Sequence, residues 1–257
     1  MRSSYYTILL LLLLSSGLVK GQSQASLRKI YAIERTDGTV CIIAENHGSM
    51  PFTATIRAEL VNMSSNVKLP LRIIVAQGDK PYILATFTPE IPVNHSYKYN
   101  FWIQDGIYTG HLPDTSYVYR LPYYPRADTI LPRHTSTAYA PWQHLYAFPL
   151  PENTAICAAR AGTVGAIMQQ AKNSSRIIAN LVYVLHDDGS YGCYENIRRN
   201  SVVCRAGQRV AVGDTLAYFG GNRPNLNFWF AVQYPTDSLV TTAPVNFRVG
   251  KRLIRSH

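Results

Sequence analysis

Pro224-Asn225-Leu226-Asn227-Phe228 leads into the last of seven short apolar segments within residues 144–232. The expected strands cover residues 154–159, 162–168, 181–185, 191–194, 209–212, 215–219 and 226–232. Glycines separate these segments, and because glycine accepts positive φ they supply tight turns between strands. The pattern predicts that this half of the chain is all-β.

Residues 26–122 carry strand patterns as well. Asp37-Gly38, between apolar residues 30–34 and 39–45, is a strong hairpin signal. Apolar and polar residues alternate over residues 52–60 and 97–103, which is typical of half-buried strands. Further strands are expected at residues 71–75 and 83–87. This spacing predicts an N-terminal β-sandwich-like domain, so the fold class expected for the whole chain is all-β.

The N-terminus, residues 1–25, has the composition of a secretory signal peptide. Arg2 precedes an apolar run over residues 8–14, and cleavage is plausible after Gly21 or Ala25. The alternative is a membrane anchor, but the run is shorter than the roughly 20 residues that a spanning helix needs. We therefore expect export with cleavage and no transmembrane span in the mature chain.

Composition divides the remaining chain and suggests its partners. Frequent prolines predict a linker over residues 123–143, before a domain at 144–247 and a basic tail at 248–257. Without Arg2 and Lys20, the formal net charge falls from +10 to +8, which favours anionic partners. Export argues against nucleic acid. The basic residues are a solvated surface or a binding patch, and they gather at Arg198, Arg199, Arg205, Arg209, Arg223, Arg248, Lys251, Arg252 and Arg255.

The four cysteines allow disulfides in an exported chain. Cys193 and Cys204 flank one connection and form the first candidate bridge. Cys157 lies in an apolar run and suits a small buried residue. A pairing of Cys41 with Cys157 and a state with all four thiols free both stay open.

Several motifs of residues 146–232 follow one another in a familiar order. Residues 180–189 look like an Asn-x-Val-x-Ile-x-His-x-Asp-Gly hairpin, and residues 158–164 look like an Ala-Ala-Arg-x-Gly-x-Val strand. Residues 194–197 stand where Tyr-x-His-Leu is expected, and residues 224–228 stand where Pro-His-Leu-His-Phe is expected. The chain thus resembles the lysostaphin/LytM-type zinc metallopeptidases (duplicated hybrid motif family), which cut peptide cross-links in bacterial cell walls. The resemblance implies a LytM-like β-sheet domain with a groove.

The same resemblance implies that the zinc chemistry is lost. The ligand Asp falls on Ala147 and a ligand His on Asn227, while two further His positions fall on Asn225 and Asn196. A methyl group cannot bind a metal, and an amide cannot act as a general base near neutral pH. His134 and His144 are both candidates for the remaining ligand. A replacement metal site could use His144, His186, Asp187 and Asp188. This is the less favoured interpretation, because a lone His beside an Asp-Gly turn is usually a hydrogen-bonded surface residue.

We therefore expect a non-catalytic LytM-like protein without zinc, in the periplasm or cell envelope of a bacterium. Peptidoglycan or an envelope protein partner would bind in its groove, and it would regulate a cell-wall hydrolase or form part of an envelope assembly. The alternative is an active zinc endopeptidase with an atypical ligand set. Neither the partner nor the oligomeric state follows from the sequence.

Overall fold

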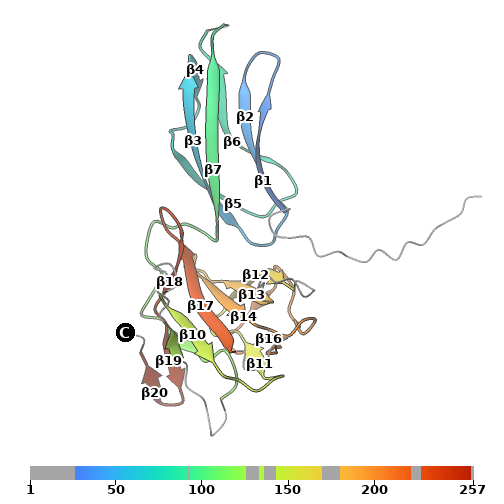
Figure 1. The fold of residues 1–257 in the computed structure, drawn as a ribbon, viewed down its shortest axis with the longest axis vertical. Helices are drawn as coiled ribbons and strands as arrows, with labels where there is room; N and C mark the ends of the chain where they lie inside the picture. Colours follow the sequence, from blue (N-terminus) through green and yellow to red (C-terminus); the bar gives the residue numbers. More distant parts are fainter. Residues whose placement is uncertain are drawn as a thin grey trace, which may run out of the picture.

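The computed structural model describes residues 27–91, 93–125, 133–135, 143–169, 180–220 and 227–255. Every regular element among them is a β-strand, which confirms the all-β class. Two β domains are arranged end to end, with the first above the second in Figure 1. Within the described residues, no helix has the length and apolar character of a membrane span. The predicted signal peptide lies outside these residues.

The first domain is a sandwich of two antiparallel sheets. One sheet has the order β1 (Arg28–Glu34), β2 (Val40–Asn46), β6 (Tyr82–Pro89), β4 (Met63–Ser65). The other has the order β5 (Leu71–Val75), β3 (Phe52–Val61), β7 (Ser96–Asp105). The predicted turn between β1 and β2 is confirmed, since Gly38 has φ +78° and the Thr39 amide donates to Asp37 Oδ1 over 2.9 Å. Alternate residues of the strands meet in one core between the sheets.

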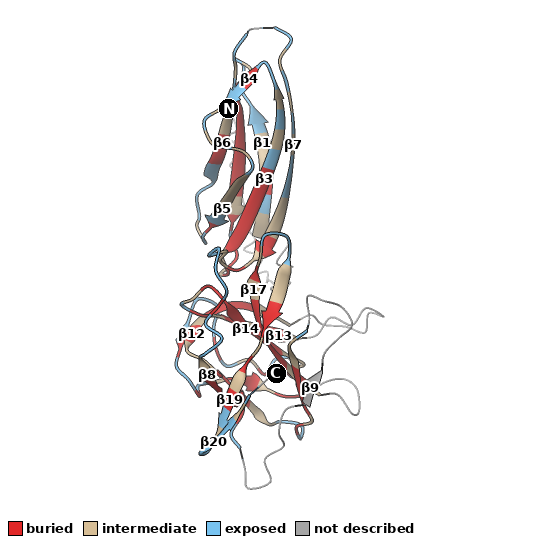
Figure 2. Cartoon of the chain, turned by 90° about the vertical axis from the view of Figure 1, so that its left-hand side faces the viewer, coloured by how far each residue is buried: buried red, intermediate tan, exposed pale blue. Residues whose placement is uncertain are grey.

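The strand β3 departs from its predicted half-buried pattern. Thr53 and Thr55, expected to face water, are 0% and 3% exposed, and the lower part of β3 is buried in Figure 2. Polar groups that contact the outer face of β3 cause this burial. Thr53 Oγ1 donates to the Gly106 carbonyl over 3.0 Å, and Arg72 Nε donates to Thr55 Oγ1 over 3.3 Å. The burial marks the end of the sandwich that meets the second domain.

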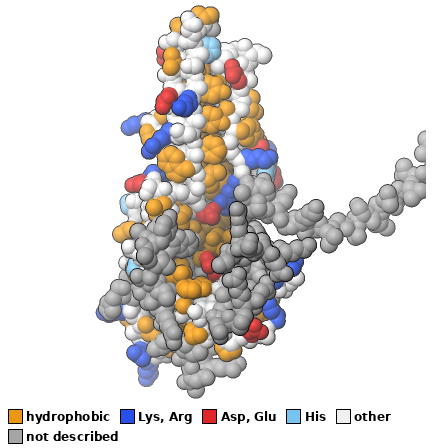
Figure 3. Space-filling model, viewed as in Figure 1, with side chains coloured by type: hydrophobic (Ala, Val, Ile, Leu, Met, Phe, Trp, Pro, Cys, Tyr) orange, Lys and Arg blue, Asp and Glu red, His pale blue; other side chains and the backbone are white. Residues whose placement is uncertain are grey.

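The edge strand β7 displays a row of aromatic rings. Tyr97, Tyr99 and Phe101 stack at centroid separations of 6.4 Å along the strand. Figure 3 shows hydrophobic side chains in a column down the first domain, in the region of β7. Tyr97 and Tyr99 also pack against the sandwich core, so the row closes the gap between the two sheets.

The second domain is built on a sheet of eight strands. Its order is β15 (Arg209–Val210), β12 (Gly162–Met168), β13 (Leu181–Leu185), β14 (Tyr191–Glu195), β17 (Phe228–Pro235), β10 (Leu145–Phe148), β9 (Arg133–Thr135), with β18 (Val240–Ala243) also paired to β17. A separate pair, β11 (Ala155–Cys157) and β16 (Thr215–Tyr218), packs over one face of this sheet. The aromatic core between them includes Phe148, Phe228 and Phe230, each 0% exposed.

The predicted basic tail is wrong for the described residues up to 255. Residues 246–254 form β19 (Asn246–Val249) and β20 (Arg252–Ile254), and β19 pairs in parallel with β8 (Val118–Arg120). The physical reason is alternation, because Phe247 is buried and Val249 packs on the core while Arg248 faces out. Tyr119 of β8 also joins the second core, although the sequence-based boundary of the first domain lies at residue 122.

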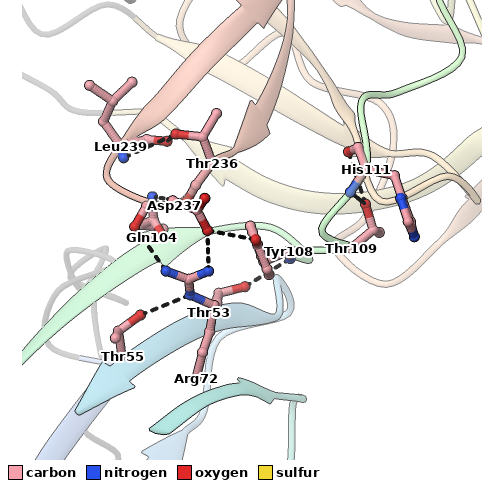
Figure 4. A network of polar contacts seen from close by, with 10 residues as sticks. All are labelled: Thr53, Thr55, Arg72, Gln104, Tyr108, Thr109, His111, Thr236, Asp237 and Leu239. Carbon is pink, nitrogen blue, oxygen red and sulfur yellow. Dashed lines mark hydrogen bonds and ion pairs between the residues drawn. The ribbon is translucent and has the colours of Figure 1, made fainter. Parts of the chain in front are cut away.

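A polar network joins the two domains (Figure 4). The turn between β17 and β18 carries Asp237, whose carboxylate lies 2.5 Å from Arg72 Nη1 and accepts from the Tyr108 hydroxyl over 2.6 Å. The Arg72 guanidinium also lies 4.2 Å from the centre of the Tyr108 ring. Gln104 Nε2 donates to the Thr236 carbonyl over 3.1 Å. We call Arg72, Gln104, Tyr108, Thr236 and Asp237 the interdomain clamp.

Candidate functional site

The two faces of the eight-stranded sheet carry different chemistry. Phe230 of β17 and Tyr194 of β14 are paired in register and lie in the second core. Because side chains alternate along a strand, Ala147, Trp229 and Glu195 lie on the opposite face, and the three are in register across β10, β17 and β14. We call the surface around these three residues the site face. It is the surface on which the sequence analysis places the groove.

Two of the predicted asparagines meet at one end of the site face. Asn196 directly follows β14 and Asn227 directly precedes β17. Asn196 has φ +63°, a backbone conformation that asparagine adopts more readily than most residues. Its side-chain Nδ2 donates to the Asn227 carbonyl oxygen over 2.7 Å. The amide of Asn196 therefore links two strand ends, while Asn225 lies outside the described residues.

The donors that the structure describes at these positions do not fit a catalytic zinc. Such a site needs three protein ligands and an open water position. Ala147 offers a methyl group that is 2% exposed, and the Nδ2 group of Asn196 is engaged by the Asn227 carbonyl. Among the residues that the structure describes, no three His, Cys, Asp or Glu side chains gather in a group that could hold a metal ion.

The two candidate histidines stand near β10. His144 immediately precedes this strand, is half-buried, and donates its backbone amide to Thr242 Oγ1 over 2.9 Å. His134 belongs to β9, where it pairs in register with Tyr146. The register places His134 opposite the residue before Ala147, and which histidine corresponds to the family ligand stays open.

Glu195 is the ionisable group that sequence reasoning missed on the site face. It occupies the variable position of the Tyr-x-His motif, and it stands beside Trp229. Burial raises the pKa of its carboxyl group, and burial also raises the pKa of the neighbouring Cys193 thiol. Cys193 Sγ donates to Glu195 Oε1 over 3.3 Å. The strand alternation of residues 191–195 was the available signal, because it puts Tyr191, Cys193 and Glu195 on one face.

The first domain covers the other end of this same face. Met50, 0% exposed, packs with Ala166 and Tyr191 in a small separate core. Ser49 Oγ donates to the Gly165 carbonyl over 2.6 Å. Tyr191 and Glu195 lie on the same face of β14, so the site face ends against the first domain at Tyr191 and continues past Glu195 towards Asn196.

The residues weighed as a replacement metal site have separate partners. Asp187 pairs with Arg209 over 2.7 Å on the surface, and Asp188 pairs with Arg160 over 2.7 Å. His186 is 2% exposed, not at the surface as predicted, with its Nδ1 2.9 Å from Ser190 Oγ. Burial, aided by the positive charge of Arg160, lowers the pKa of His186 to about 3, so the ring stays neutral.

The predicted Cys193–Cys204 bridge is wrong. All four cysteines are buried and free. The physical reason is the strand alternation, because Cys193 lies on the same face as Glu195 whereas Cys204 belongs to the core on the other side of the sheet. A ten-residue connection that looks short in sequence thus ends on opposite faces of one sheet.

Comparisons with known proteins address the second domain. The sequence model of peptidase family M23 matches residues 144–237. Among solved structures, the chain is similar to a putative peptidase M23 from Pseudomonas aeruginosa at 13% identity and a TM-score of 0.33, covering 68% of this chain and 86% of that one. It is also similar to Csd3 from Helicobacter pylori at 13% identity and a TM-score of 0.37, covering 89% of this chain and 76% of that one. No curated protein matches.

The family match spans β10 to the turn after β17, which includes the site face. Its sequence pattern and the all-β sheet agree with the resemblance drawn from the motifs. Over residues 144–237 the chain carries a domain of peptidase family M23, the LytM type.

Proposed function

We propose that the M23-type domain is a non-catalytic binding domain of an exported cell-envelope protein, with peptidoglycan peptide strands as its ligand. The proposal depends on one observation above all. Where family members hold zinc, this chain has the buried methyl group of Ala147, and it has an amide of Asn196 engaged by the Asn227 carbonyl. These groups can bind a peptide but cannot polarise a scissile bond.

The chemistry of the site face supports a peptide ligand. A carboxamide both donates and accepts hydrogen bonds, so the Asn227 side chain can pair with a peptide backbone or with an N-acetyl group. Trp229 is half-buried beside Ala147 and offers an apolar surface next to these polar groups.

Binding to isolated cell-wall sacculi tests the proposal. The Asn227→Ala variant should bind about fivefold or more weakly, since one hydrogen bond to the ligand is lost. Asn100→Ala is a matched control, because Asn100 is an exposed asparagine on β7 of the first domain. Wild-type protein that fails to sediment with sacculi, or equal binding by Asn227→Ala and the control, would count against the proposal.

The alternative, an active zinc endopeptidase, has the family match in its favour. Metal analysis of the purified chain separates the two functions. We expect zinc far below one equivalent per chain and no lysis of sacculi. Close to one zinc per chain together with lysis would establish the alternative.

A further inference from the structure

A pocket of about 350 Å³ lies on the second domain between the parallel strands β8 and β19, away from the site face. It is lined by two arginines, Arg120 and Arg248, and by apolar side chains that include Val118, Leu121 and Val212. Its volume falls within the range of about 300–1,000 Å³ that is usual for small-molecule sites. In Figure 1 the hairpin β19–β20 lies at the end of the molecule opposite the first domain.

Strand register puts the two guanidinium groups together. Arg120 and Arg248 are paired in the parallel ladder, so their backbones are about 4.8 Å apart. The preceding pair, Tyr119 and Phe247, is buried in the core at 3% and 0% exposure. Because side chains alternate along a strand, both arginine side chains project side by side from the outer face of this small sheet.

Acidic neighbours do not neutralise this pair. None of the ion pairs within the described ranges involves Arg120 or Arg248. Like charges directly opposite on neighbouring strands destabilise a sheet, so the pair has an unfavourable electrostatic energy that an anion would relieve. Lys251 and Arg252, both exposed on the same hairpin, add further positive charge.

One acidic residue, Asp214, stands close to the pocket. Its Oδ2 accepts the Ala211 amide over 2.8 Å, so it closes its own turn. Gly213, beside it, has φ +94°, and a Cβ at this position would lie 2.3 Å from Arg120 Nη1. The glycine thus leaves space for the guanidinium of Arg120, which also lies 4.4 Å from the Tyr124 ring centre.

We propose that this pocket binds a phosphate ester, with Arg120 and Arg248 holding the phosphate group and the apolar walls contacting its organic part. Guanidinium groups pair with phosphate through two parallel hydrogen bonds, and two of them can surround one phosphate. An inorganic anion alone would leave the apolar walls unused. The phosphate ester has two possible sources, a phospholipid headgroup and a soluble ester. This site does not depend on the proposed function of the site face.

Two binding measurements on the full chain distinguish the sources. Titration calorimetry uses glycerol 3-phosphate, and cosedimentation uses vesicles of phosphatidylcholine with or without phosphatidylglycerol. Binding to glycerol 3-phosphate assigns a soluble ester, whereas binding only to the vesicles that contain phosphatidylglycerol assigns a lipid headgroup. In either arm, Arg120→Gln/Arg248→Gln should weaken binding about tenfold or more.

The control removes the same charge elsewhere. Lys80→Gln/Lys98→Gln takes two exposed positive charges from the first domain and should leave binding within about twofold of wild type. Arg120→Lys/Arg248→Lys keeps the charge but loses the two-pronged hydrogen bonding, so it should bind several-fold more weakly than wild type. Three results would each overturn the proposal. They are an equal loss of binding in Lys80→Gln/Lys98→Gln, full binding by Arg120→Lys/Arg248→Lys, and no binding of wild type to either ligand.

A stability measurement separates binding from a structural role. Without ligand, Arg120→Gln/Arg248→Gln should melt at the same temperature as wild type or higher, because the repulsion across β8 and β19 is removed. A lower melting temperature would mean that the arginines hold the sheet together, and it would also overturn the proposal.

Discussion

Single side chains determine the chemistry of the site face. In the proposed function, Ala147, Asn196 and Asn227 take the places of groups that could bind a metal or transfer a proton. Ala147 lies within β10, and Asn196 and Asn227 lie at the ends of β14 and β17. Glu195, which the motif comparison passed over, is the acid that remains there. Its carboxyl group is surrounded by Cys193 and Trp229 instead of by cations. The proposed function accordingly assigns ligand binding, not hydrolysis, to this face.

Restoring the family's aspartate at residue 147 should not restore metal binding. In Ala147→Asp a carboxylate would replace a methyl group that is 2% exposed, and we expect a loss of about 3 kcal/mol in the free energy of unfolding. Chemical denaturation with and without zinc measures this loss. Wild-type stability together with one bound zinc would show that a ligand set is already in place. Ala147→Ser serves as a control for size.

Glu195 should make stability depend on pH. Burial raises the pKa of its carboxyl group in the folded state, so the folded chain binds the proton more tightly than the unfolded chain. This contribution is present at low pH and is lost as pH rises above the ordinary pKa of glutamate. Glu195→Gln should therefore gain stability relative to wild type from pH 4 towards pH 7. The exposed Glu59→Gln is the control, and a parallel shift in both variants would contradict the assignment.

Strands and turns determine how the two domains meet. The turn between β17 and β18 reaches the first domain through the interdomain clamp, and residues 49–50 reach back to β12 and β14. Both contacts adjoin the eight-stranded sheet at strand ends. The second contact fixes the end of the site face that lies against the first domain, at Tyr191.

Cutting the interdomain clamp should loosen one hairpin without unfolding either domain. Arg72→Ala removes the partner of Asp237 and the stacking on Tyr108, so amide exchange in residues 236–239 should become faster. Hydrogen exchange followed by mass spectrometry measures the change. Arg57→Ala is the matched control, since Arg57 stacks on Trp102 within the first domain only. Unchanged amide exchange in residues 236–239 would show that the interdomain clamp does not stabilise this hairpin.

The molecule as a whole combines two cores and two separated surfaces. The site face ends against the first domain at Tyr191, whereas the pocket of Arg120 and Arg248 lies between β8 and β19. The β19–β20 hairpin lies at the end of the molecule opposite the first domain (Figure 1). A bound peptide and a bound phosphate ester would thus not compete for space.

Metal removal should leave the folded chain unaffected. A ligand that binds only the folded state raises its stability in proportion to the logarithm of ligand concentration over Kd. Because the described donors do not fit zinc, a chelator should not lower Tm and added zinc should not raise it. Differential scanning calorimetry checks both. A Tm that falls with chelator and recovers with zinc would contradict the expectation.

Local patterns in the sequence predicted the all-β class, most strand positions and the turn at Asp37-Gly38. They succeed because alternation and turn chemistry act between residues that are near neighbours in the chain. The motif resemblance over residues 146–232 likewise agrees with the M23 family match, which covers residues 144–237. The proposal that ligand chemistry is lost at Ala147 also comes from the sequence, since a methyl group cannot bind a metal.

Only the tertiary structure decided which distant segments meet. β8 pairs with β19 across more than a hundred residues, which turns an expected tail into the wall of a pocket. The sheet separates Cys193 from Cys204, and the first domain buries Tyr191 beside Met50. Such contacts depend on register and packing between elements remote in sequence, and no local pattern encodes them. The residue types came from the chain itself, and the surfaces on which they act came from how its two domains pack.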